Sequence, residues 1–132
     1  MSAEHVLHAA LVTALRGADG LDGAINGVFE GPAVQASPPF AEVQPMIAID
    51  WGTKDGAGRE LRPAVVVRDA GETPARLHAL AEAVAAAVEG LPRDLDGWRV
   101  ASNVFVRSRM LPEAAGRWAV SIEFRVRMLR AF

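Results

Sequence analysis

Three glycines and a lysine lie close together in DWGTKDGAGRELRPAVVV, residues 50–67. Glycine next to lysine is typical of loops that bind phosphate, but a P-loop reads G-x-x-x-x-G-K-[ST] and leads from a strand into a helix. Here Lys54 precedes Gly56 and Gly58, and a strand-like run follows. No helix N-terminus would therefore offer its N–H groups to an anion. The segment is predicted to be a hairpin loop with Asp55-Gly56 at its turn.

The same loop carries residue types that are common in protein interfaces. Tryptophan and arginine are enriched at interface hot spots, and the loop holds Trp51 and Arg59 beside Lys54 and Asp55. One interpretation is a flexible hairpin tip with no further role. The other is an arm that becomes ordered only against a partner.

Histidines and carboxylates elsewhere give no complete catalytic or metal-binding pattern. His5 and His8 are three residues apart, a spacing that can hold a metal, but zinc sites usually have three or four ligands. His78 and Glu82 form an i,i+4 pair without a recognisable nucleophile beside it. No serine lies in a G-x-S-x-G motif. We therefore expect no enzymatic activity, no metal and no cofactor.

Arginines recur on the polar side of the two C-terminal strand patterns. Arg125 and Arg127 alternate with apolar residues near the C-terminus, and Arg99 and Arg107 do so in the run before it. Cross-strand pairs with Glu123 would explain them. A face that binds acidic patches on another subunit would explain them equally, because the guanidinium group binds carboxylates through two parallel hydrogen bonds.

Composition limits the class of protein. The chain has 132 residues, of which 51% are hydrophobic, enough for the core of one domain spanning residues 1–132. It has no cysteine, so disulfides and thiolate metal sites are excluded. No apolar run approaches the roughly 20 residues of a membrane span, and no signal peptide is recognisable, so we expect a soluble protein made in the cytosol. A net charge of −2 argues against tight binding of nucleic acid.

Two helices are predicted by apolar residues at helical spacing. The first spans about residues 3–16, with Ser2 as its N-cap and Gly17 after its end. The second begins at Pro74 after a capping Thr73 and ends at Gly90. Its core stripe contains four residues: Leu77, Leu80, Val84 and Val88.

Four alternating runs predict strands. The first, EVQPMIAID, places Val43, Ile47 and Ile49 on one face, and the second is LRPAVVVRD. The third, WRVASNVFVR, places four apolar residues on one face: Trp98, Val100, Val104 and Val106. The fourth is RWAVSIEFRVRMLR. The predicted fold is α+β: an antiparallel sheet of about four strands with two helices on one face, in the order helix–hairpin–helix–hairpin. Short VFEG is a further candidate strand.

The complete layout resembles the phage tail-terminator, or tail-completion, family, which includes relatives in gene transfer agents. The resemblance covers nearly the whole chain. It rests on the N-terminal helix, VFEG and PPF, the segment DWGTKDGAGRELRPAVVVRD, the helix ARLHALAEAVAAAVE, and the closing pair GWRVASNVFVRSRML and GRWAVSIEFRVRML. The order and spacing of these segments are more specific than any one of them.

This resemblance implies a structural protein of a virion or phage-like particle, assembled in the bacterial cytoplasm. It implies a homohexameric ring that caps the tail tube, stops its polymerisation and joins it to the head connector, while DNA passes through the lumen without specific binding. Its partners would be itself, the tail tube protein and the connector, with no membrane. We assign the interaction surface to Trp51, Lys54, Asp55, Arg59, Arg125 and Arg127. The alternative is a small α+β ligand-binding or regulatory module, possibly dimeric.

Overall fold

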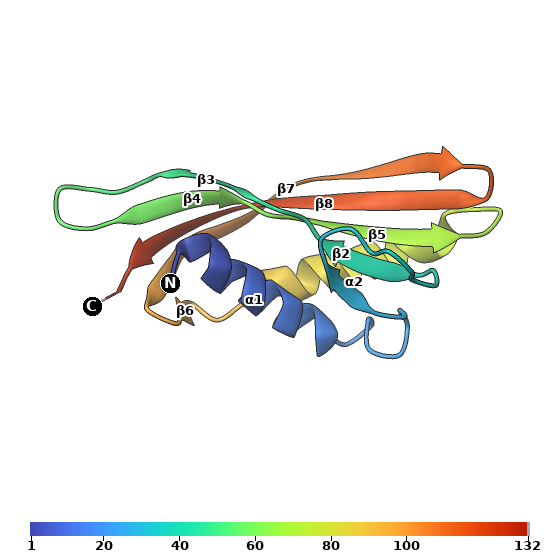
Figure 1. Ribbon diagram of the computed structural model, residues 1–132, viewed down its shortest axis with the longest axis horizontal. Coiled ribbons are helices and arrows are strands. Elements are labelled where there is room, and N and C mark those ends of the chain that lie inside the picture. Colours follow the sequence, from blue (N-terminus) through green and yellow to red (C-terminus); the bar gives the residue numbers. More distant parts are fainter. Residues whose placement is uncertain (132) are drawn as a thin grey trace.

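Two helices cover one face of a long, curled sheet in the computed structural model, which describes residues 1–131 (Figure 1). The fold class is therefore α+β, as predicted. The elements follow the chain in this order: α1 (Ala3–Arg16), β1 (Val28–Glu30), β2 (Phe40–Val43), β3 (Ile47–Asp50), β4 (Gly58–Arg62), β5 (Ala64–Ala70), α2 (Ala75–Glu89), β6 (Asp94–Leu95), β7 (Trp98–Ala114) and β8 (Arg117–Arg130).

Strand β8 lies in the middle of this sheet. One of its edges pairs with β5 and then with β4, and the other pairs with β7. Strand β2 extends the sheet beyond β5, and β3 extends it beyond β4. All these pairs are antiparallel, whereas β1 pairs with β2 in parallel. The sheet is thus mixed and has eight strands, and the predicted antiparallel sheet of about four strands is wrong on both points.

Two prolines divide the predicted first and second strands. Val43 pairs with Val65 and Ile47 pairs with Arg62, so Pro45 and Met46 together lie opposite Pro63. Such a bulge inserts one extra residue, and one extra residue turns all later side chains to the opposite face. Ile47 and Ile49 were predicted to share the face of buried Val43. They instead lie on the other face, with 70% and 52% of their surface exposed.

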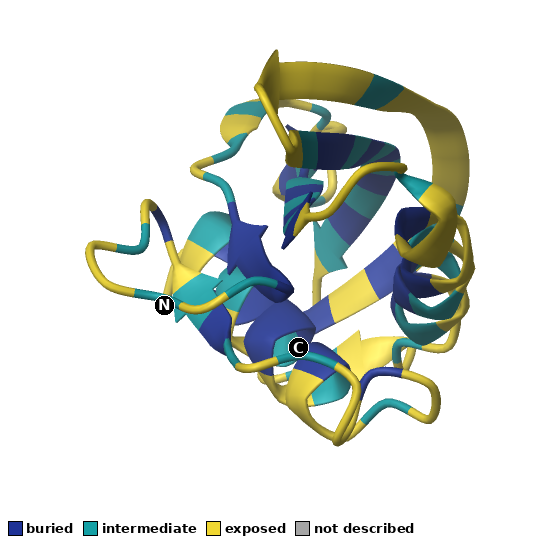
Figure 2. Cartoon of the chain, turned by 90° about the vertical axis from the view of Figure 1, so that its right-hand side faces the viewer, coloured by how far each residue is buried: buried dark blue, intermediate teal, exposed yellow. Residues whose placement is uncertain are grey.

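Strand β7 departs from the predicted alternation for the same reason. Its register against β8 shifts between Val100 and Ser102, and again after Phe105. Trp98 and Val100 are buried as expected, but Val104 and Val106 are exposed. The outer part of β7 is exposed along nearly its whole length, beside a β8 whose residues are mostly buried or half-buried (Figure 2).

Both helices begin and end close to the predicted residues. The Ser2 Oγ accepts a hydrogen bond from the His5 N–H, and the chain leaves α1 at Gly17. At α2, Pro74 occupies the N-cap position, and the Thr73 Oγ1 accepts a weak hydrogen bond from the Ala75 N–H. Helix α2 ends at Gly90, and its predicted core stripe is buried.

The core lies between the helices and one face of the sheet. Strand β8 contributes alternate residues to it, from Val120 to Met128, and Phe124 is the largest side chain that is fully buried. The Phe105 ring meets the Phe124 ring edge to face, with 5.9 Å between centroids. Leucines of α1 and the stripe of α2 complete the same cluster.

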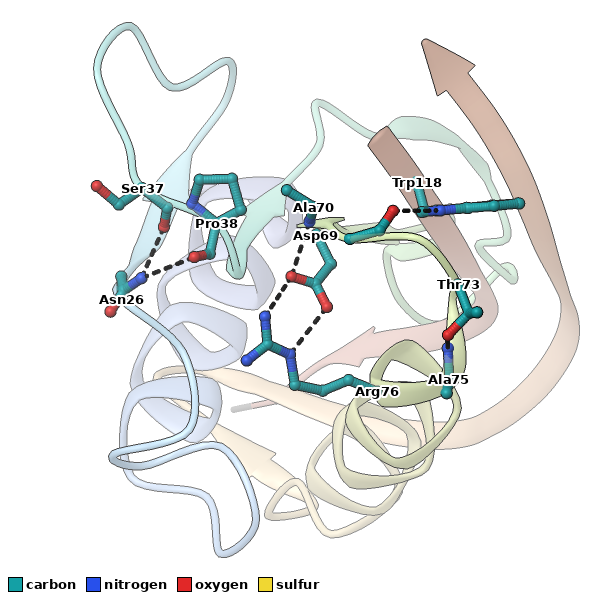
Figure 3. A network of polar contacts seen from close by, with 10 residues as sticks. Asn26, Ser37, Pro38, Asp69, Ala70, Thr73, Ala75, Arg76 and Trp118 are labelled. Carbon is teal, nitrogen blue, oxygen red and sulfur yellow. Dashed lines mark hydrogen bonds and ion pairs between the residues drawn. The ribbon is translucent and has the colours of Figure 1, made fainter. Parts of the chain in front are cut away.

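An ion pair between buried Asp69 and exposed Arg76 connects α2 to the end of β5 (Figure 3). Both carboxylate oxygens of Asp69 accept hydrogen bonds from the Arg76 guanidinium group, at 2.6 and 2.9 Å. The Ala70 N–H donates a third, at 2.8 Å. Chiefly because of the bonds from Arg76, the pKa of Asp69 is lowered from its ordinary value.

Replacing Phe124 by alanine tests the core. We expect Phe124→Ala to reduce the free energy of unfolding by about 3–5 kcal/mol, since it leaves a large cavity. Phe105→Ala is the control: its ring is 44% exposed, so the loss should be about 1 kcal/mol, mainly the aromatic contact. Denaturant titration measures both. Equal losses would contradict the described packing.

The Asp69–Arg76 pair predicts an acid-dependent loss of stability. Because folding lowers the pKa of Asp69, the stabilisation is present above the unfolded pKa of about 4 and is lost as the pH falls through the folded value. We expect Asp69→Asn to destabilise the protein at pH 7 by about 1–3 kcal/mol. The difference in free energy of unfolding between this variant and the wild type should become smaller at acidic pH. The control Asp22→Asn, at an exposed position, should change the free energy of unfolding little at any pH.

Candidate protein-interaction surface

The predicted loop forms the tip of the β3–β4 hairpin, which lies at one end of the long axis of the molecule (Figure 1). The Thr53 N–H donates to the Gly56 carbonyl at 2.9 Å, so Lys54 and Asp55 occupy the centre of the turn, one residue before the predicted position. Both side chains are exposed. Arg59 lies on β4, where Nη1 is 3.5 Å from the Asp50 carboxylate.

Gly58 is required where this hairpin narrows. A Cβ at this position would lie 2.5 Å from the Trp51 carbonyl oxygen, closer than real contacts allow. The Trp51 N–H in turn donates to the Gly58 carbonyl at 3.0 Å. The glycine thus permits the close backbone approach that positions Trp51.

Trp51 and Arg127, predicted separately, lie in contact. The Arg127 guanidinium carbon is 5.3 Å from the centre of the Trp51 ring, a cation–π distance. Arg127 Nε also donates to Glu60 at 2.9 Å, and Arg62 approaches Glu60 at 3.6 Å. The hydrogen bond from Arg127 is the main cause that lowers the pKa of Glu60. These contacts attach the base of the hairpin to β8.

Ion pairs continue across the sheet face that points away from the helices. Arg107 donates twice to Glu123, at 2.9 and 3.2 Å, which confirms the predicted cross-strand pair. Near the other end, Arg68 Nε lies 2.7 Å from buried Glu42 and also pairs with Glu113. Among the described residues Arg125 forms no ion pair, and its Nε is buried without a hydrogen-bond acceptor.

The remaining sequence candidates stay apart from one another. His8 Nε2 lies 3.0 Å from Glu30, and His78 and Glu82 are both exposed on α2. Within residues 1–131, no group of three His, Cys, Asp or Glu residues is arranged to hold a metal ion. A hollow of about 440 Å³ lies beside α1 and is lined in part by Ala9 and Leu95. None of the described helices has the length and hydropathy of a membrane span.

Sequence reasoning missed two kinds of residue on this surface. Glu60 and Glu42 are buried acidic partners of the arginines, and isolated glutamates in short strands carry no signal of such pairing. The exposed apolar residues of β3 and β7 were assigned to the core. Pro45, inside a predicted strand, was the available signal for the bulge that exposes Ile47 and Ile49.

The contact between Arg127 and the hairpin generates a prediction. Arg127→Ala should raise the pKa of Glu60 toward its ordinary value, because it removes the largest cause of the lowering. It should also increase amide hydrogen exchange at residues 51–58 several-fold, since more frequent local opening accelerates exchange. Arg125→Ala is the matched control and should change both much less. NMR measures both quantities, and identical effects of the two variants would contradict this arrangement.

Comparison with known proteins finds a matching family model and matching solved chains. Residues 9–129 match the family model described as "Tail completion protein gp17". A solved chain from a structure titled "Virion of native gene transfer agent (GTA) particle" has a TM-score of 0.81 and 25% sequence identity, over 98% of this chain and 99% of that chain. No curated protein matches the sequence.

Proposed function

Since this chain belongs to the family of tail completion protein gp17, we propose that it is the tail terminator of a phage-like particle, virus or gene transfer agent. Copies of the chain form a ring, with six as the expected number, on the end of the finished tail tube. The ring stops further polymerisation of the tube and presents a surface to the head connector. DNA passes through its lumen.

The observation that carries this proposal is the end-to-end similarity to a chain of a gene transfer agent virion. The alignment covers 98% of this chain and 99% of that chain, so the similarity includes the helices, the sheet and the projecting hairpin. The subunit itself is suited to assembly, since the β3–β4 hairpin projects at one end of the molecule (Figure 1) and carries exposed Lys54 and Asp55. A net charge of −2 is compatible with a channel that releases DNA.

The structure refines the roles that we propose for the interface residues. Lys54 and Asp55 are exposed at the hairpin tip and are available to a partner. Trp51 and Arg127 contact each other, so we assign them to holding the hairpin in place. Arg125, which has no ion pair in the described chain, is the better candidate for an acidic group on another subunit.

Assembly state gives the first test. A cyclic ring buries two different surfaces on every subunit, so the purified chain should show a monomer–hexamer equilibrium that shifts to hexamer as concentration rises. Native mass spectrometry over a concentration series measures this. A protein that stops at dimers at high concentration would contradict the ring and favour the alternative of a small dimeric ligand-binding module.

The hairpin tip gives the second test. We expect replacement of Lys54, Asp55 and Arg59 together by alanine to leave the melting temperature nearly unchanged, since exposed positions contribute little stability. Tails made with this variant should lose length control or fail to join heads, as seen by electron microscopy. The hairpin tip should be mobile in the free subunit and ordered in the assembled ring.

A matched variant distinguishes the hairpin from the surface in general. Asp19, Asp22 and Glu72 are also exposed, and their joint replacement by alanine should give normal tails. If the hairpin variant folds and produces tails of normal length that join heads, the hairpin is only a connection between strands and its proposed role is wrong.

A further inference from the structure

Within the described chain, β3 and β7 form open edges on opposite sides of the sheet. Strand β3 pairs with β4 alone, and β7 pairs with β8 and, at its first two residues, with short β6. The remainder of β7 has no strand on its outer side. Edge strands present unpaired N–H and C=O groups that can pair with another chain. These edges are therefore potential docking sites.

The directions of the strands make the two edges complementary. Strands β3, β4, β8 and β7 lie side by side in this order, and each neighbouring pair is antiparallel. Three successive reversals of direction separate β3 from β7, so β3 runs opposite to β7. A second copy placed beside the first in the same orientation would bring its β3 next to this β7. The two strands would then be antiparallel and the sheet would continue without reversal.

The length of regular backbone also matches. The register of β7 against β8 shifts between Val100 and Ser102 and again between Phe105 and Arg107. Between these shifts, Ser102–Phe105 pairs regularly with β8. This segment has four residues, as has β3. Bulges disrupt pairing, so they bound this segment on both sides. Beyond the second shift, Arg107–Pro112 is a longer regular stretch of six residues, whereas Ser102–Phe105 has the same length as β3.

Apolar residues lie on the same face at both edges. Ile49 pairs with Glu60 and Val104 pairs with Arg125, so both side chains point away from the helices. Ile47 shares that face, two residues before Ile49. All three are exposed in the single chain, Val104 by 42%. Joining the edges would place isoleucine beside valine in cross-strand pairs, which stabilise antiparallel sheets.

Buried polar atoms without hydrogen-bond partners lie at the same segment of β7 and on the adjacent part of β8. Among the described residues, three buried side-chain atoms have no hydrogen-bond partner: Ser102 Oγ, Asn103 Oδ1 and Arg125 Nε. Two belong to the regular segment of β7, and the third lies on β8 opposite Val104. Buried polar groups without partners are rare in native structures and call for an explanation. An edge that a neighbouring subunit completes and repacks provides one.

We propose that β3 of one copy adds to Ser102–Phe105 of the next copy, and that the ring closes through these antiparallel pairs. This inference rests on the proposed ring but specifies its contact. Each subunit uses a different edge on each side, as a head-to-tail interface requires. With both faces matched, Ile47 of one copy lies opposite Val104 of the next and Ile49 lies opposite Ser102. Residues 47–49 therefore pair with residues 102–104, and Asp50 lies beyond the regular segment.

Disulfide cross-linking tests the pairing, because the natural chain has no cysteine. The variant Ile47→Cys/Val104→Cys, oxidised at high protein concentration and also within assembled particles, should give covalent multimers that extend beyond the dimer on a non-reducing gel. Directly opposite residues in antiparallel strands are close enough for a disulfide after slight adjustment. Either single variant should give dimers at most.

A control pair keeps one edge and moves the other cysteine. Val34→Cys/Val104→Cys has an equally accessible thiol at Val34, which is 95% exposed but lies outside the strands, and it should not form a ladder. If the Ile47/Val104 variant forms rings by native mass spectrometry without cross-linking, the edge pairing is wrong while the ring remains. If neither purified protein nor particles give the ladder, the pairing is equally overturned.

Charge substitution provides a second readout. Ile47→Lys/Val104→Lys places like charges directly opposite each other across the joined edges, which destabilises such a pair. We expect the concentration needed for half-assembly to rise at least tenfold, with the melting temperature of the monomer nearly unchanged. Val34→Lys should leave assembly as in the wild type. Unchanged assembly of the double-lysine variant would overturn the proposal.

Discussion

Strand β8 pairs with neighbours on both of its edges, and the other elements take their positions from it. From Val120 to Met128 its residues alternate strictly between buried and half-buried positions. One set enters the core beneath the helices, and the other set carries Glu123, Arg125 and Arg127 on the opposite face. Because the side-chain period of a strand is two, a one-residue slip of β8 would exchange these sets. It would bury charge and expose Phe124, so the register of the whole sheet follows from this strand.

This constraint explains which parts of the fold could be predicted. The helices and β8 have long, regular apolar periods, and each was placed within a residue or two. The predicted faces of β3 and β7 were wrong because a local pattern cannot show where one strand carries an extra residue relative to its partner. The alternation of Val43, Ile47 and Ile49 looks continuous in sequence only because the bulge at Pro45 and Met46 is a property of the pair, not of either strand.

The candidate surface shows the same limit. Sequence indicated Trp51 and Arg127 as interface residues by type, yet their contact depends on β4 lying between β3 and β8. Pairing Arg107 with Glu123 was predictable because both strands had been identified as neighbours. The Arg68–Glu42 pair was not, since β2 was merged with β3 in the sequence interpretation and its register against β5 was unknown. Side-chain partners become predictable only after the register is known.

The proposed ring depends on the features that sequence reasoning missed. Head-to-tail assembly needs two different surfaces on one chain, and an open antiparallel sheet has two such edges as a direct consequence of its topology. Unprotected edges also invite uncontrolled association. In this chain, bulges bound Ser102–Phe105 on both sides, and β3 is an equally short strand. A short pairing segment is weak alone but is reinforced when every subunit makes it twice in a closed ring. A closed ring also leaves neither of these edges free, so closure removes the exposed strands that would otherwise permit open-ended growth.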